Sequence, residues 1–126
     1  MWIRTPASTC LVALALAFTL GGALGQDTKT AKGFFSGSRL YEECFRDHPL
    51  SYGFCLGFVA GVTDTYFLLV ASNVSLGAWR ACIGANVTAE QIRNAVKHYL
   101  ALHPETRDYM AADLVSAALA EEFPCE

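Results

Sequence analysis

Residues 52–71 read YGFCLGFVAGVTDTYFLLVA, a run of 20 residues that is almost wholly apolar. A helix that is apolar on all sides is either buried in a protein core or spans a membrane. Asp64 lies near the centre of the run, and an ionisable side chain at mid-membrane costs about 2.5–3.5 kcal/mol. We therefore expect the central buried helix of a soluble bundle, with a membrane span as the alternative.

Three glycines, Gly53, Gly57 and Gly61, recur every four residues in this run and share one helical face. Because glycine lets a second backbone approach closely, Gly57 and Gly61 are predicted to have a packing role. Asp64 must find a hydrogen-bond partner or stay exposed, since an isolated buried carboxylate is costly. A structural role is favoured for Asp64, because no second carboxylate lies nearby in the sequence to form an acid/base pair.

A shorter amphipathic helix is expected before this run. Its apolar face collects Leu40, Tyr41, Cys44 and Phe45. A serine at position 36 or 38 can cap its start. Pro49 disfavours helical geometry in the residue before it, so the helix is expected to end within residues 46–49.

Two further helices are expected after the apolar run. Thr88 and Gln91 form a capping box, which starts a helix that reaches about Leu102. Pro104 ends that helix and can occupy the first turn of another, which runs to about Glu122.

The remaining connections show no helical or strand periodicity. Residues 72–81 mix turn formers with a tryptophan and are expected to hold at most one helical turn, and residues 82–87 are expected to form a loop. Since no long stretch alternates as a strand does, the predicted fold class is all-α, a small four-helix bundle.

The first 25 residues are laid out as a secretory signal peptide, with an early arginine, an apolar run at 11–20 and small residues at the end. Ala23 and Gly25 occupy the two small positions, so cleavage is predicted between Gly25 and Gln26. The apolar run is short against the roughly 20 residues of a membrane span, which favours cleavage over a retained anchor. Residues 26–126 are then expected to form a single helical domain outside the membrane.

Four cysteines follow the predicted cleavage site: Cys44, Cys55, Cys82 and Cys125. An even number in an exported chain predicts two disulfides. Their separations are too wide for the close ligand pairs of a zinc site. Of the three possible pairings, Cys44–Cys55 with Cys82–Cys125 would suit short loops between antiparallel helices. We favour Cys44–Cys82 with Cys55–Cys125, which would tie sequence-distant helices together.

The sequence argues against nucleic-acid binding and against catalysis. The formal net charge is −3 and the lysines and arginines form no cluster, so a nucleic-acid partner is not expected. A cysteine–histidine enzyme is conceivable from His48, His98 and His103. Paired cysteines and the lack of a nucleophile motif weigh against it. We expect no enzyme activity, no metal site and no cofactor.

Several short motifs follow one another between about Gly37 and Cys125. They are Leu40 with Cys44, CLGFVAGVTD at 55–64, Cys82-Ile83, VTAEQ at 87–91, Tyr99-Leu100, His103-Pro104-Glu105 and Leu119 with the ending Phe123-Pro124-Cys125. In this order they resemble the Rap/Tai family of immunity proteins, which protect bacteria against peptidoglycan-cleaving amidases delivered by type VI secretion. The family pattern includes an aspartate at Asp64. Gly84 departs from the proline that often follows Cys-Ile in the family.

The resemblance implies a helical homodimer in the periplasm that binds its cognate amidase and blocks the active site. The predicted export signal agrees with this, because a toxin that acts on the cell wall is met outside the cytoplasm. The alternative is a structural or stress-related envelope protein with no toxin partner.

A toxin-binding chain needs an outward contact surface, and the helix at 88–102 is the first candidate. Its outward side chains are predicted to be Glu90, Arg93, Asn94, Lys97 and His98. The irregular segment 72–79 is the second candidate, because an exposed Trp79 would make a good anchor.

Overall fold

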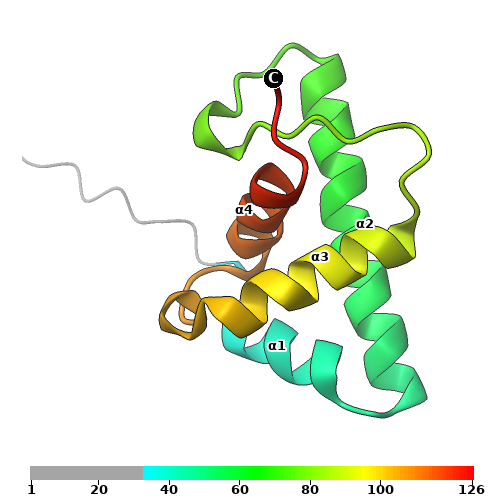
Figure 1. Ribbon diagram of the computed structural model, residues 1–126. Helices are drawn as coiled ribbons and strands as arrows, with labels where there is room; N and C mark the ends of the chain where they lie inside the picture. The colour runs from blue at the N-terminus through cyan, green and yellow to red at the C-terminus, as the bar shows by residue number, and fades with distance from the viewer. Residues whose placement is uncertain (1–32) are drawn as a thin grey trace, which may run out of the picture.

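The computed structural model describes residues 33–126, so the predicted signal peptide and its cleavage site lie outside the described residues. This part of the chain forms four α-helices and two 3₁₀ turns (Figure 1). In chain order they are α1 (Gly37–Phe45), α2 (Pro49–Ala71), η1 (Gly77–Trp79), α3 (Ala89–Leu102), η2 (Pro104–Thr106) and α4 (Ala111–Glu122). No strand occurs between residues 33 and 126, only an isolated bridge between Ser36 and Met110. The all-α four-helix prediction is confirmed.

The predicted caps start the helices. The Ser36 hydroxyl accepts a hydrogen bond from the Arg39 amide at the start of α1. Thr88 and Gln91 form the complete capping box of α3. Helix α2 begins at Pro49, before the apolar run, because proline suits the first helical position and the His48 ring accepts the Leu50 amide at 3.2 Å.

The fourth helix begins later than predicted, at Ala111 instead of Pro104. The backbone between these two positions accepts hydrogen bonds from the start of α1. The Gly37 amide donates to the Tyr109 carbonyl at 2.9 Å, and the Ser38 amide donates to the Arg107 carbonyl at 2.6 Å. These bonds satisfy amides that a helix start leaves without partners. The prediction was wrong because it counted only local helix signals.

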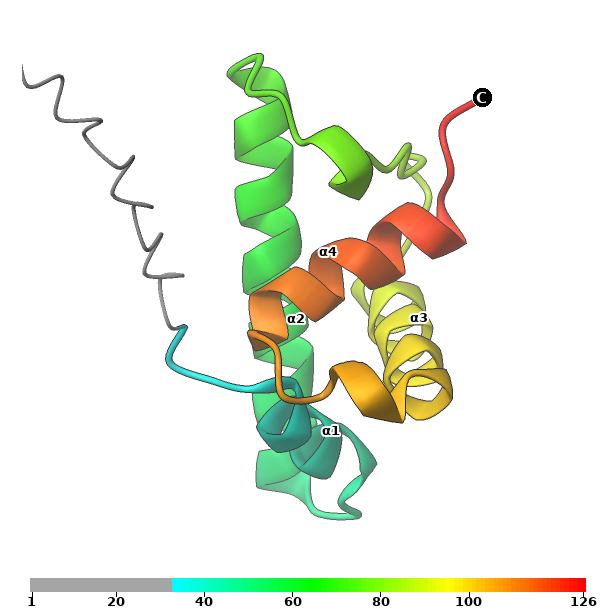
Figure 2. The ribbon, with the colours of Figure 1, turned by 90° about the vertical axis from the view of Figure 1, so that its left-hand side faces the viewer.

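The core lies where α1, α3 and α4 pack against one side of α2. Figure 2 shows α2 as a long rod with the three shorter helices beside it. The largest side chains that are fully buried come from all four helices: Leu40, Val59, Val96, Leu100, Val115 and Leu119.

Helix α2 is central, as the sequence predicted, because α1, α3 and α4 all pack against it, but it is not buried on all sides. Its buried residues form one narrow stripe, Ser51, Cys55, Val59, Thr63 and Tyr66. The other helices cover one side of it, so most of its residues are exposed or only partly buried. By length and apolar composition alone α2 could cross a membrane, a property that core helices of soluble proteins also show.

The glycine stripe of α2 faces outward, contrary to expectation. Gly53, Gly57 and Gly61 are exposed, and a Cβ added to any of them would meet no atom within 4 Å in the described chain. The predicted close approach of another helix to Gly57 and Gly61 is therefore absent there. Asp64 takes the exposed position that the sequence allowed.

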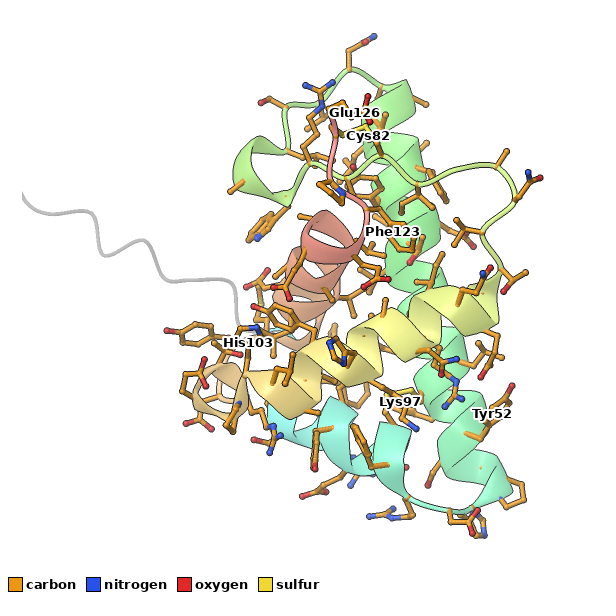
Figure 3. All side chains as sticks on the ribbon, viewed as in Figure 1. Tyr52, Cys82, Lys97, His103, Phe123 and Glu126 are labelled. Carbon is orange, nitrogen blue, oxygen red and sulfur yellow. A yellow bond between two sulfur atoms is a disulfide. The ribbon has the colours of Figure 1, made fainter. Side chains whose placement is uncertain are left out.

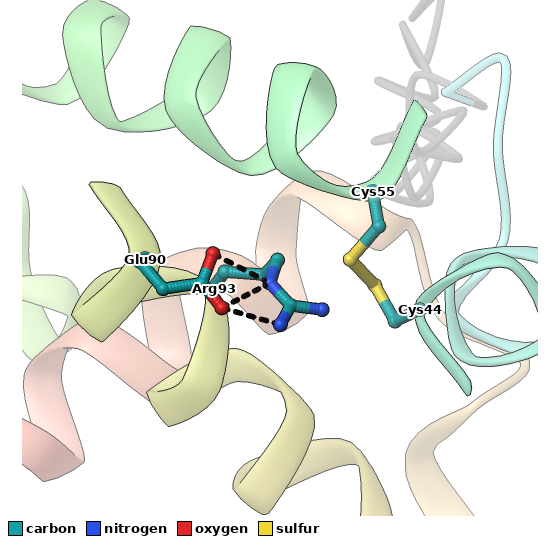
Figure 4. The surroundings of a disulfide bond; sticks show 4 residues. All are labelled: Cys44, Cys55, Glu90 and Arg93. Carbon is teal, nitrogen blue, oxygen red and sulfur yellow. Dashed lines mark hydrogen bonds and ion pairs between the residues drawn. A yellow bond between two sulfur atoms is a disulfide. The ribbon is translucent and has the colours of Figure 1, made fainter. Parts of the chain in front are cut away.

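The disulfide pairing differs from the one we favoured. Cys82 pairs with Cys125, which ties the loop before α3 to the end of the chain, and the Cys82 amide donates to the Phe123 carbonyl at 2.7 Å (Figure 3). Cys44 pairs with Cys55 across the hairpin of α1 and α2 (Figure 4). In both pairs the Cα atoms are 5.0 Å apart. The short connection between α1 and α2 brings Cys44 and Cys55 together, so the favoured pairing was wrong.

Candidate functional site

The predicted contact residues of α3 occupy two separate places. Lys97 lies against Phe45 of α1 (Figure 3), and Glu90 and Arg93 contact Tyr52 near the start of α2. Asn94 and His98 are exposed and line a hollow of about 420 Å³ shared with Glu122 and the chain end. The sequence had placed all five on one outward face, and the structure differs from this at Arg93, whose side chain is largely covered.

Arg93 is held inside the protein instead of pointing freely outward. Its side chain is 12% exposed, and its Nε lies 3.1 Å from both carboxylate oxygens of Glu90 (Figure 4). The Tyr52 hydroxyl donates to the same carboxylate at 3.0 Å, and the guanidinium lies 4.8 Å over the Tyr52 ring. These three residues join α2 to α3, and we call them the Tyr52 triad.

The titration of the Tyr52 triad follows from these contacts. The hydrogen bond from Arg93 holds the pKa of Glu90 below its ordinary value, and Tyr52 and the charge of Lys97 lower it further. The same carboxylate raises the pKa of Tyr52 and of Arg93. The carboxylate and the guanidinium therefore stay ionised together at neutral pH.

Lys97 stands at a cavity of about 480 Å³ between α1, α2 and α3, which we call the Lys97 cavity. Its wall includes Phe45, Arg46, Asp47, Tyr52, Arg93 and Lys97. Arg46 is engaged with Glu43 at 3.3 Å and Arg93 with Glu90. The Lys97 ammonium lies 4.7 Å over the Phe45 ring, and no salt bridge within residues 33–126 includes it. A carboxylate from outside could therefore pair with Lys97.

The second candidate surface, residues 72–79, borders an apolar groove that sequence reasoning missed. The groove has a volume of about 550 Å³ and lies between α2 and α4 beneath η1. Its lining includes Gly57, Gly61, Leu69, Trp79, Ala112 and Asp113, and Trp79 is 44% exposed. We call it the α2–α4 groove. The glycine stripe was its sequence signal, which had been interpreted as internal packing.

The described part of the chain contains no constellation for metal or thiol chemistry. Histidine, cysteine, aspartate and glutamate side chains form no group of three that could hold a metal within residues 33–126. The four cysteines in this range are all disulfide-bonded. His48 caps α2, and His103 lies beside Glu105 and Glu121.

The described residues form a disulfide-bridged helical domain with the Lys97 cavity, which holds one cation without a salt bridge in this range, and a separate apolar groove. The family model for Rap1a immunity proteins matches residues 36–125, and the chain belongs to this family. The Rap/Tai resemblance is thereby confirmed, and the family makes the chain an immunity protein against a secreted toxin. Searches of curated proteins and of solved structures find no match.

Proposed function

We propose that this chain is an exported, periplasmic immunity protein that inhibits a peptidoglycan amidase delivered by type VI secretion, and that it does so by binding alone, without catalysis or a cofactor. The family match over residues 36–125 carries the proposal. The two disulfides support it, because structural disulfides persist in oxidising compartments such as the periplasm.

We place the toxin contact at the Lys97 cavity. Lys97 is its cation without a salt bridge in the described structure, whereas Arg46 and Arg93 are already paired. The Tyr52 triad fixes one wall, so little ordering is needed when a partner binds. A carboxylate of the toxin that enters the cavity would form a charge-assisted hydrogen bond with Lys97.

Substitution of Lys97 tests this placement. We expect Lys97→Glu to weaken toxin binding by more than about tenfold, because it places like charges at the contact. Arg80→Glu is the matched control, since it makes the same change in charge on an exposed residue outside the Lys97 cavity. Calorimetric titration of both variants measures the difference. Equal affinities of the two variants would move the contact elsewhere.

We also propose that the protein forms a homodimer, as the Rap/Tai resemblance implies. The end of α2 leaves apolar side chains uncovered: Phe67, Leu68 and Val70 are 44%, 65% and 48% exposed. Apolar surface of this kind is commonly covered by a partner. Sedimentation analysis should show a dimer, which Phe67→Asp dissociates.

The direct test of the function is a capture experiment with the oxidised protein purified from the periplasm. Periplasmic extract and the product of the neighbouring secreted gene are passed over it, and bound proteins are identified by mass spectrometry. We expect a cell-wall amidase that loses its activity on mixing. An amidase that stays fully active in the complex would contradict inhibition.

A further inference from the structure

The α2–α4 groove is an apolar depression whose lining shares no residue with that of the Lys97 cavity. Phe58, Val62 and Leu69 of α2 and Trp79 of η1 supply apolar walls, and α4 contributes Ala112. An exposed apolar groove of about 550 Å³ is unfavourable in water and is typical of a site that another molecule covers.

The floor of the groove is shaped for a close approach by a helix. Gly57 and Gly61 lie one turn apart on it, and Thr65 follows one turn later. A Cβ at either glycine would meet no atom of residues 33–126 within 4 Å. An incoming helix could therefore bring its backbone nearer here than to a surface of larger side chains, which increases van der Waals contact.

The groove also carries a charge that selects its occupant. Asp113 of α4 lies on the lining, half-buried among apolar groups. Burial raises the pKa of its carboxyl, and no cation or hydrogen bond from residues 33–126 offsets this effect. No salt bridge of the described residues includes Asp113. A cation delivered by the occupant would compensate the carboxylate.

We propose that the α2–α4 groove is a second docking site of this immunity protein, which takes the apolar face of a toxin helix that carries a lysine or arginine opposite Asp113. The assignment of the helix to the toxin rests on the proposed function. The expectation that the bound helix is apolar with one cationic side chain rests on the lining of the groove. Two contact surfaces would let the protein hold the toxin at the groove while a toxin carboxylate enters the Lys97 cavity.

Trp79 provides a local signal for the first test. The probe is a tryptophan-free helical peptide of leucine and alanine with one lysine, about 15 residues long so that it can form a helix. Its twin has glutamate in place of lysine. We expect the lysine peptide to shift the Trp79 emission to shorter wavelength in a saturable way, with at least about tenfold higher affinity than its twin. A Trp79→Phe variant assigns the signal.

Two variants connect this signal to the groove. Asp113→Asn should remove the preference for the lysine peptide over the glutamate peptide. Gly61→Leu should abolish binding of the lysine peptide, because the leucine side chain would fill the floor of the groove. Gly84→Leu is the matched control, because Gly84 also has open space around it but lies in an exposed loop outside the groove. Equal affinity for the two peptides, or a preference that persists in Asp113→Asn, would overturn the proposal.

The remaining outcomes concern who fills the groove. Gly61→Leu should weaken the binding of the captured amidase at least about tenfold relative to Gly84→Leu. Unchanged amidase binding would overturn the toxin as occupant. Dissociation of a dimer by Gly61→Leu alone, seen by sedimentation, would assign the groove to a second copy and overturn the proposal. If no amidase is captured although the peptides discriminate, the proposed function fails and the toxin is overturned as the occupant.

Discussion

At the scale of single residues, pairing decides which charged side chains are free to act. The sequence shows that Glu90 and Arg93 lie one helical turn apart, so their ion pair could have been predicted. The role of Tyr52 could not, because it comes from another helix and its hydroxyl reaches Glu90 only when α2 and α3 pack. That contact removes Arg93 from the predicted partner surface, whereas Lys97 takes part in no salt bridge of the described residues.

Glu43 makes stability depend on acid pH. Its buried carboxylate lies 2.7 Å from the Arg39 guanidinium. A hydrogen bond from Ser51 lowers the pKa of Glu43 from its ordinary value of 4.5, and the charges of Arg39 and Arg46 lower it further. A pKa that is lower in the folded than in the unfolded protein contributes stability above the unfolded value, and this is lost as the pH falls through the folded value.

Glu43→Gln should therefore flatten the fall of the melting temperature below about pH 4.5, the ordinary value. Thermal unfolding over a series of acid pH values measures this. Glu42→Gln, which removes an exposed carboxylate from the same helix, is the control and should follow the wild type. Equal profiles for the wild type and Glu43→Gln would rule out this role.

The carboxylate of Asp113 should lower the stability of the folded protein, although it is proposed to favour binding of a lysine- or arginine-bearing helix. Burial raises the pKa of its carboxyl, so the ionised form is disfavoured by folding at neutral pH. We expect Asp113→Asn to keep or raise the melting temperature at pH 7, with a gain that disappears as the pH falls through the raised pKa. A clear loss of stability at pH 7 would show that the carboxylate has a stabilising partner.

At the scale of elements, the signals that could be predicted are local ones. The capping box of α3 and the serine cap of α1 involve residues within one turn, and both form as expected. The exposure of α2 and the delayed start of α4 depend on contacts between distant segments, such as Ser38 with Arg107. Apolar composition alone could not show which side of α2 the other helices would cover.

The glycine stripe allows a simple test of the observed packing of α2. Gly61→Ala should stabilise the protein by about 0.5–1 kcal/mol, because alanine is the better helix former and its Cβ meets no atom of the described chain within 4 Å. Gly37→Ala should destabilise it, since its Cβ would lie 2.9 Å from the Arg107 carbonyl oxygen. Urea unfolding measures both. A destabilised Gly61→Ala would show that the stripe is covered.

The two disulfides should contribute unequally to the free energy of unfolding. They close separations of 11 and 43 residues, for which chain entropy gives about 3 and about 4 kcal/mol. Replacing Cys82 and Cys125 by alanine should therefore lower the free energy of unfolding more than replacing Cys44 and Cys55. Urea unfolding of the two double variants decides the order, and the reverse order would indicate strain in the native C-terminal bridge.

At the scale of the whole molecule, the fold leaves two unlike surfaces available for a partner. The Lys97 cavity offers a cation, and the α2–α4 groove offers an apolar depression with one carboxylate. The family could be predicted from ordered motifs, and its match covers residues 36–125. The groove could not, because its walls come from α2, η1 and α4, which are brought together only by folding.

The most direct test of the central claim is the rate of peptidoglycan hydrolysis by the captured amidase as the oxidised protein is added. We predict that the rate falls to zero near one immunity chain per amidase, that Arg80→Glu inhibits like the wild type, and that Lys97→Glu requires a large excess. Hydrolysis that continues unchanged in an excess of folded, disulfide-bonded protein would contradict the account.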